Sequence, residues 1–506
     1  MPLNFVQFLS TFLSTLNEYP IAVPRISGTH LKFAVLKTSF IAFFLMATGA
    51  FAQTGGLYSL QGAIDLAIKN SIDVRLAEIN TEQAEISYKQ SKLNVTPDAS
   101  LTAGQFFQSG RSIDRFTNQF VQTTVRSNNF QLQSSALLFG GGQIRQGIQQ
   151  SKYLWLASES DLKNVSQNVA LNVANLFLQV LQARELANSA RQTLANTVLQ
   201  LERTSKLFEA GVVNEGQVLN LKAQKASDEL TLTNAENQEN LALANLKMLL
   251  RLPSDTPFDI VAPVVSANKP EIYPYSLYEL YDSALARRPD IKSSELRFTA
   301  AKYGKKVALG GLMPTLSVGG NVSTVYSSNA KFVSGTVFSG FQPIGRVQGS
   351  NDIVEAPDFE YTLQTIAFNK QIKDNFGQSL GFNLSYPVYG KLRNQTNYKL
   401  SRLDEERARL NAERSRQNLY NEVVGAYNNF AAAEKRYTSA IEATDAQKKN
   451  AEFVQKRFDA GQSNVYELQL ARTTEANAKL NLASVKYEYI FRRMILDFYM
   501  GKELKL

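Results

Sequence analysis

A long proline-free segment occurs twice in this chain, and it constrains the fold more than any other feature. The first copy covers residues 143–252, and the second runs from residue 393 to the end of the sequence. Each copy contains a Phe-x-Ala-Gly sequence, which ends at Gly211 in the first copy and at Gly461 in the second. On both sides of these glycines, apolar and small residues recur in steps of three and four, a spacing typical of helices packed as a coiled coil. Each copy therefore predicts a long helix, a tight turn at the glycine and a returning helix.

The whole chain is a tandem duplication. An offset of 217 residues relates Pro97 to Pro314, and an offset of 250 residues relates Phe208 to Phe458. The second copy therefore carries 33 more residues than the first in its middle segment, the difference between the two offsets. In the first copy the long helix is predicted over residues 143–209, with shorter helices over about 57–96 and 215–250.

The sequence also predicts the domain boundaries. Lys32 and Lys37 precede an apolar run and a small-residue pattern at Ala50-Phe51-Ala52, which is typical of a signal peptide and predicts export. Five prolines between residues 253 and 274 predict an extended connector. The expected units are a leader and signal peptide (1–52), a first repeat (53–252), the connector (253–274) and a second repeat (275–506). Within the repeats we expect strand hairpins at about 99–139 and 315–389, helical hairpins at about 143–250 and 393–502, and tips at about 207–214 and 457–464.

The middle segment of each copy alternates apolar and polar residues with a period of two, which predicts strands with one apolar and one polar face. Segments 99–110 and 127–142 carry no charged residue, whereas Arg111, Asp114 and Arg126 lie between them. Two uncharged strands of roughly ten residues that flank a charged loop fit a transmembrane hairpin. A soluble hairpin with one face on a core is the alternative. In the second copy, residues 327–374 are rich in Ser, Gly and Asn and are predicted to form a long extracellular loop.

Composition excludes most kinds of catalytic site. The chain has no cysteine, and its single histidine, His30, lies in the predicted leader. The exported chain would therefore lack a thiolate, an imidazole base and a Cys/His metal set, so we expect no enzyme activity and no cofactor or metal. The formal net charge of +9 is not gathered into dense basic runs, and no nucleic-acid partner is expected.

The strand count predicts an oligomer. Two hairpins give four strands per chain, and four strands cannot close a barrel in lipid, because the exposed edges would leave backbone groups unsatisfied. A trimer with twelve strands is one solution among several.

The ordered series of signal, helix, proline, strand hairpin, long helix, Phe-x-Ala-Gly turn and returning helix, given twice, resembles the TolC-type outer-membrane efflux protein family over residues 57–502. The resemblance implies a mixed fold: long antiparallel coiled-coil helices form a periplasmic α-barrel, and four strands per chain complete a 12-stranded outer-membrane β-barrel in a homotrimer. It implies passive export of substrates from a tripartite efflux pump or a type I secretion system, in the outer membrane of a Gram-negative bacterium. The implied partners are a periplasmic membrane-fusion adaptor, an inner-membrane pump or ABC exporter, and outer-membrane lipid. A non-channel periplasmic coiled-coil scaffold or adaptor is the alternative.

The resemblance also implies two groups of site residues. The turns would form periplasmic tips that contact the adaptor, although the glycines could serve only to reverse the chain. An acidic pore constriction would follow the turns, but the second acidic position of the family falls on Leu470, and Glu467 could equally be an ordinary solvated helix residue. The tip residues are Ala210, Gly211, Val212, Val213, Asn214, Ala460, Gly461, Gln462, Ser463 and Asn464, and the constriction residues are Glu467, Gln217 and Glu215.

Overall fold

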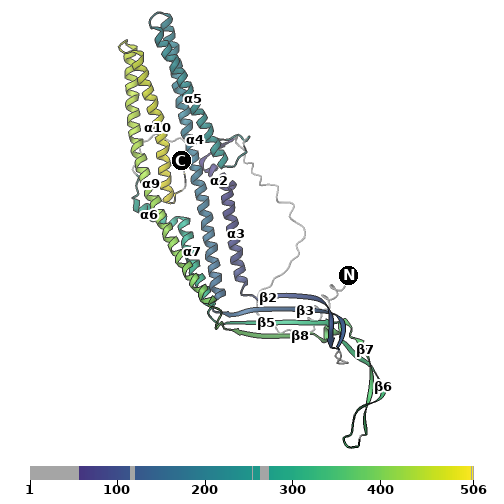
Figure 1. Cartoon of the computed structure of the whole chain (residues 1–506). Helices are drawn as coiled ribbons and strands as arrows, with labels where there is room; N and C mark the ends of the chain where they lie inside the picture. Colours follow the sequence, from purple (N-terminus) through teal and green to yellow (C-terminus); the bar gives the residue numbers. More distant parts are fainter. Residues whose placement is uncertain are drawn as a thin grey trace, which may run out of the picture. The chain divides into compact units, whose positions relative to one another are not determined.

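The structure is a computed structural model, shown in Figure 1. It describes residues 56–113, 120–253, 255–262, 273–350, 352–502 and 504. The predicted leader, residues 1–52, lies outside the described residues, as does Asp114 in the predicted charged loop.

Each repeat runs through helices, strands and helices again. In the first repeat the elements are β1 (Leu57–Tyr58), α2 (Leu60–Asn70), α3 (Ile72–Leu93), β2 (Asp98–Ile113), β3 (Phe120–Gly140), α4 (Gln143–Glu209) and α5 (Glu215–Leu249). After β4 (Asp259–Ile260), the second repeat has α6 (Leu277–Arg287), α7 (Pro289–Gly310), β5 (Thr315–Ser327), β6 (Lys331–Arg346), β7 (Ile353–Thr365), α8 (Phe368–Asp374), β8 (Gly377–Ser385), α9 (Arg393–Asp459) and α10 (Val465–Tyr499).

The predicted long helices and their returning partners are present. Helices α4 and α9 have 67 residues each, and α5 and α10 have 35 each. A 67-residue helix is about 100 Å long at the usual rise per residue. Helix α5 packs along α4, and α10 packs along α9, so each pair forms the predicted antiparallel hairpin. In the described part of the chain, no helix is both long and apolar enough to cross a membrane.

The prediction of one continuous helix over residues 57–96 was wrong, because the helix is interrupted at Ser71. The Ser71 backbone is extended (φ −67°, ψ 128°), and its hydroxyl accepts a hydrogen bond from the Val74 backbone N–H at 3.3 Å, which caps α3. The same interruption occurs in the second repeat at Arg288, which precedes Pro289. Proline disfavours a helical conformation for the residue before it, so α6 ends there and α7 begins. In each repeat, two consecutive helices therefore stand in place of one short helix: α2 and α3 in the first repeat, and α6 and α7 in the second.

The strands of the first hairpin are longer than predicted. Strand β2 has 16 residues and β3 has 21, and both Arg111 and Arg126 lie within them instead of in a loop. The pairing continues through these charged positions, and the Arg111 guanidinium lies over the Phe120 ring, 4.7 Å from its centre. Strand β8 is shorter than the predicted alternation, which reaches residue 389. It ends at Ser385, just before Pro387, which has no N–H to donate to a sheet.

Four strands form one antiparallel sheet in the order β2-β3-β5-β8. The register aligns Leu101 with Leu132, and Leu132 with Val322, so the apolar positions of neighbouring strands share a face as predicted. On β5 and β8, Val318 lies opposite Phe382 on that face. The adjacent residues, such as Asn383, point to the opposite, polar face. The sheet is thus apolar on one face and polar on the other.

The prediction of a long loop over residues 327–374 was wrong. Strands β6 and β7 pair in a separate antiparallel hairpin, and the short helix α8 follows them. Phenylalanines and valines recur along β6 between its Ser and Gly residues, and β7 is rich in β-branched and aromatic residues, which favour strands.

The helical core is organised around α4. Helix α4 packs against α3, α5 and α7, and α7 also packs against α9. A first core cluster joins α2, α4, α5, β4 and α10, and a second joins α6, α9 and α10. The connector between the repeats is held against α4: the guanidinium of Arg184 forms ion pairs with Glu239 of α5 and Asp259 of β4, and Ile260 is buried. Strand β4 pairs with β1 in parallel.

Candidate functional site: helical tips and strand edges

The turn between α4 and α5 is built by one left-handed glycine and one capping asparagine. Gly211 has φ +72°, and its N–H donates to the Phe208 carbonyl at 2.9 Å, while the Val212 N–H donates to the Leu207 carbonyl at 2.9 Å. These bonds satisfy carbonyls at the end of α4 that have no partner within the helix. The Asn214 side chain accepts from the Gln217 N–H at 3.1 Å and begins α5.

The turn between α9 and α10 repeats this geometry. Gly461 also has φ +72°, and the Gln462 N–H donates to the Arg457 carbonyl at 2.8 Å. The Asn464 side chain accepts from the Glu467 N–H at 2.8 Å. Most residues of both turns are exposed, while Val213 and Ser463 are half-buried. The two turns therefore share the same hydrogen-bonding pattern and glycine conformation, and most of their residues are exposed to solvent.

The two tip glycines are required by backbone conformation and not by lack of space. A Cβ added at Gly461 would meet no atom within 4 Å, and the same holds for Gly425 in the middle of α9. We therefore expect Gly461→Ala to destabilise the protein by about 1–2 kcal/mol, because a left-handed conformation is unfavourable for alanine. Gly425→Ala is the matched control and should stabilise by about 0.5–1 kcal/mol. Chemical denaturation followed by circular dichroism measures both. If both substitutions changed the free energy of unfolding in the same direction, this explanation would be contradicted.

The three predicted constriction residues lie in the first turns of α5 and α10. Glu467 accepts a hydrogen bond from the Ser463 hydroxyl at 2.5 Å, and its carboxylate lies 4.0 Å from the Arg457 guanidinium. Glu215 is exposed at the first position of α5. Gln217 occupies the position equivalent to Glu467, and its side-chain carbonyl oxygen is buried without a hydrogen-bond partner within the described residues. In the single chain, Glu467 is thus held by its own tip.

The sequence analysis missed contacts of charged side chains near the tips, one between the two helical hairpins and one within the second hairpin. Arg203 of α4 forms an ion pair with Asp459 of α9 at 3.4 Å. The Arg472 guanidinium of α10 donates to the Gln455 side chain of α9 at 2.6 Å. Burial lowers the pKa of Arg472 below its usual value, although the nearby carboxylates Glu475 and Asp459 act in the opposite direction. No sequence pattern pairs residues so far apart, and this explains the omission.

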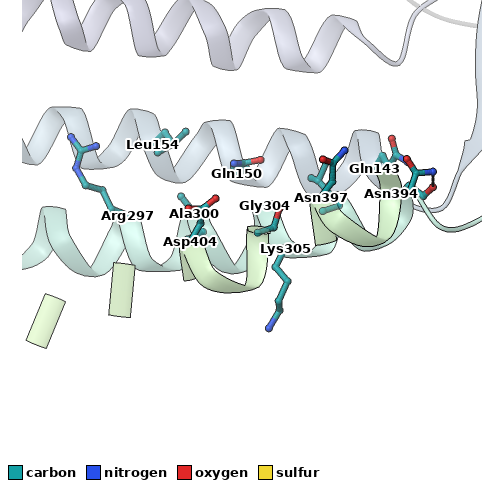
Figure 2. A pocket seen from close by; sticks show the side chains of 15 residues that line it. Gln143, Gln150, Leu154, Arg297, Ala300, Gly304, Lys305, Asn394, Asn397 and Asp404 are labelled. Carbon is teal, nitrogen blue, oxygen red and sulfur yellow. Dashed lines mark hydrogen bonds between the residues drawn. The ribbon is translucent and has the colours of Figure 1, made fainter. Parts of the chain in front are cut away.

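A hollow on the helices lies away from both tips. A cavity of about 690 Å³ is bounded by α4, α7 and α9, and Figure 2 shows its lining side chains from these three helices. At Gly304 the α7 backbone approaches α4 so closely that an added Cβ would lie 2.9 Å from Gln150 Nε2. Asn394 of α9 donates to the Gly311 carbonyl at 2.7 Å. None of the predicted tip or constriction residues lines this cavity. Several of the α7 residues that line it are alanine or glycine, whose small side chains leave space between the helices.

The four-stranded sheet has two open edges. Within the described residues, β2 pairs only with β3, and β8 pairs only with β5. Along β8, Leu380, Phe382 and Leu384 are exposed on the apolar face. An exposed edge next to an apolar face is unfavourable in a monomer, because its backbone groups and apolar side chains both need partners.

Comparison with protein families identifies the class. The model of the outer membrane efflux protein family matches residues 63–250 and 280–502. The chain therefore belongs to the outer membrane efflux protein family and is an outer-membrane protein. The matched segments cover most of both repeats, from within α2 to the end of α5 and from within α6 to the end of α10.

Similar proteins include exporters of several bacteria. The chain is 27% identical over 283 residues to the pyoverdine export outer membrane protein OpmQ of Pseudomonas aeruginosa, covering 53% of this chain and 56% of OpmQ. It is 23% identical over 299 residues to the outer membrane efflux protein BepC of Brucella suis, covering 58% of this chain and 60% of BepC. The similarity thus spans less than two thirds of the length of these relatives.

Solved structures share the fold over nearly the full length. A structure of CusC has a TM-score of 0.69 at 17% identity and covers 90% of this chain and 96% of its own. The outer membrane protein VceC of Vibrio cholerae has a TM-score of 0.69 at 14% identity, and the match covers 88% of this chain and 97% of VceC. The open-state MtrE outer membrane channel of Neisseria gonorrhoeae has a TM-score of 0.65 at 17% identity, and the match covers 88% of this chain and 89% of MtrE. These likenesses confirm the predicted fold of long helices and strands, and the family and its neighbours are channel proteins, which are not enzymes.

Proposed function

We propose that this protein is a trimeric outer-membrane channel through which substrates leave the cell passively. It would serve as the outer component of a tripartite efflux pump or a type I secretion system. The observation that carries the proposal is the four-stranded sheet, which has one apolar face, one polar face and two unpaired edges. Joining β8 of one chain to β2 of the next removes every edge, and three chains give a closed twelve-stranded barrel with its polar face towards the lumen.

The helices support the same assembly. Within the described residues, α3 packs mainly against α4, whereas α7 packs against both α4 and α9. Leu76 and Ile86 of α3 are exposed in the single chain. Packing α3 against α9 of the neighbouring chain would bury such residues and close the helices into a barrel that continues the lumen.

The tips would contact a periplasmic membrane-fusion adaptor, which in turn binds an inner-membrane pump or ABC exporter. The proposed contact residues are Ala210–Asn214 and Ala460–Asn464. Their support is geometric: both turns are exposed and have the same glycine conformation, so one adaptor surface could bind either turn. Substrates and partners of the named relatives do not specify the cargo of this chain.

The acidic residues beside the tips would narrow the pore. Three copies of Glu467, one from each subunit, would form a ring that favours cations, with Glu215 and Gln217 of the other tip beside it. The bond from Ser463 and the nearby Arg457 hold this carboxylate in one orientation, which a selective ring needs.

Conductance in planar bilayers tests the channel and the ring together. Wild-type protein should give discrete channels with a preference for cations. Glu467→Gln should keep the channels but weaken that preference, because it removes one negative charge per subunit. Glu413→Gln, at an exposed position on α9, is the control for a charge change remote from the tips. If the wild type and Glu467→Gln had the same preference for cations, Glu467 would not be part of the constriction.

Folded and oligomeric protein that gives no channels would instead favour a periplasmic coiled-coil scaffold, the second candidate. That candidate is supported by the long helical hairpins, but it gives no reason for a sheet with an apolar face and open edges.

A further inference from the structure

The β6–β7 hairpin projects from the end of the sheet that lies farthest from the helices (Figure 1). Its strands pair from Lys331–Thr365 to Arg346–Ile353, and it is a two-stranded sheet separate from the other four strands. An isolated two-stranded hairpin is marginally stable in water, because it has no second layer to cover its apolar side chains. A hairpin of this length therefore needs a surface to pack on.

One face of the hairpin is aromatic. The register places Phe338 opposite Phe359, and the two rings are 5.9 Å apart in an edge-to-face arrangement. Phe341 packs edge-to-face on Phe338, with the ring centres 5.3 Å apart. Tyr361 lies two residues beyond Phe359 on β7 and therefore on the same face. All four rings are well exposed in the single chain: Phe338 53%, Phe341 65%, Phe359 40% and Tyr361 58%. Such a contiguous patch is typical of a contact surface.

The base of the hairpin is fixed to the sheet, so the aromatic face has a defined position. Gln371 of α8 is 2% exposed, and its side chain accepts from the Ser327 N–H at 2.9 Å and donates to the Ser327 carbonyl at 3.0 Å. The Thr324 hydroxyl donates to the Ile372 carbonyl at 2.8 Å, and Phe368 packs on Tyr326. Helix α8 therefore holds the chain that returns from β7 against the end of β5.

Charge separates the candidate partners. Residues 331–365 contain two basic side chains, Lys331 and Arg346, and four acidic ones, which leaves a net charge of −2. Asp358 and Glu360 point to the face opposite the phenylalanines. Anionic headgroups at a membrane bind basic surfaces, and this hairpin has an acidic face instead of a basic one. The uncharged aromatic centre instead matches an identical copy of itself, in which the acidic faces point outwards.

We propose that the aromatic face of each β6–β7 hairpin packs against the hairpin of a neighbouring copy of this chain, beyond the outer end of the strands. The inference rests on the oligomer in the proposed function, where the hairpins rise from one rim and are held at high local concentration. The contact joins the subunits at the end opposite the helical tips.

Single cysteines test the contact, since the chain has none of its own. Phe359→Cys places a thiol on the aromatic face, and Glu360→Cys places one on the opposite face of the adjacent residue. The full-length variants are assembled in lipid and treated with a short bis-maleimide. We expect covalent dimers from Phe359→Cys and their loss in Glu360→Cys.

The outcomes separate this inference from the proposed function. Intact oligomers in which Phe359→Cys fails to cross-link, or in which both variants cross-link equally, overturn the hairpin contact and leave the channel standing. Failure of wild-type protein to form an oligomer overturns both. A bimane label at residue 359 that is quenched by brominated lipid would show that the face lies in the membrane, and would also overturn the contact between copies.

Discussion

Phe382→Arg is expected to abolish assembly in the membrane, whereas Asn383→Arg should leave it intact. Phe382 lies on the apolar face of β8, and its side chain is 69% exposed in the single chain. In a closed barrel this face contacts lipid, and an arginine near the centre of the bilayer costs about 2–4 kcal/mol in each subunit. Asn383 points to the polar face, where an arginine would contact water in the lumen. Each trimer would carry the unfavourable charge three times.

Insertion into lipid vesicles, followed by the migration of the oligomer on electrophoresis without heating, measures this difference. Because the two positions are adjacent on one strand, local effects on strand pairing are matched. Loss of assembly in both variants would mean that β8 tolerates no bulk on either face, and normal assembly of Phe382→Arg would argue against a lipid-facing sheet.

The second large effect is expected at the centre of the helical core. Phe177 of α4 is fully buried where α2, α5, β4 and α10 meet. Phe177→Ala would leave a cavity between elements of both repeats, and a loss of about 3–5 kcal/mol in the free energy of unfolding is typical of such truncations. Gln179→Ala, an exposed position two residues along α4, is the control and should change stability little.

Urea unfolding followed by circular dichroism measures both variants. A loss in Phe177→Ala no greater than in the control would indicate that the repeats do not share one core. A second, separate unfolding transition in Phe177→Ala would indicate that the two repeats unfold as separate units.

Residue patterns alone predicted the repeating architecture. The helical hairpins of α4–α5 and α9–α10 follow from uninterrupted three-and-four spacing and from Gly211 and Gly461, which are signals carried by residues close in sequence. The alternating faces of β3, β5 and β8 follow for the same reason. Where a single short-range signal competed with a long pattern, the prediction failed: Ser71 interrupts a helix that the periodicity made continuous, and Pro289 marks the equivalent interruption in the second repeat.

For the candidate site, the sequence located both turns and the residues after them but not their surroundings. The bond from Ser463 to Glu467 and the capping by Asn214 depend on the folded turn. The pairing of Arg203 with Asp459 joins residues more than 250 positions apart. Such contacts arise from the way the two hairpins pack, which no local pattern contains.

The sequence by itself thus determined the duplication, the long helices, the glycine turns and the two-faced strands, because each depends on the spacing of neighbouring residues. Only the tertiary structure decided that β6 and β7 form a hairpin with an aromatic face, that Arg184 binds the connector to α4, and that the four strands of the sheet follow the order β2-β3-β5-β8. These features depend on which distant segments come into contact, and that choice is made by burial and hydrogen bonding over the whole fold.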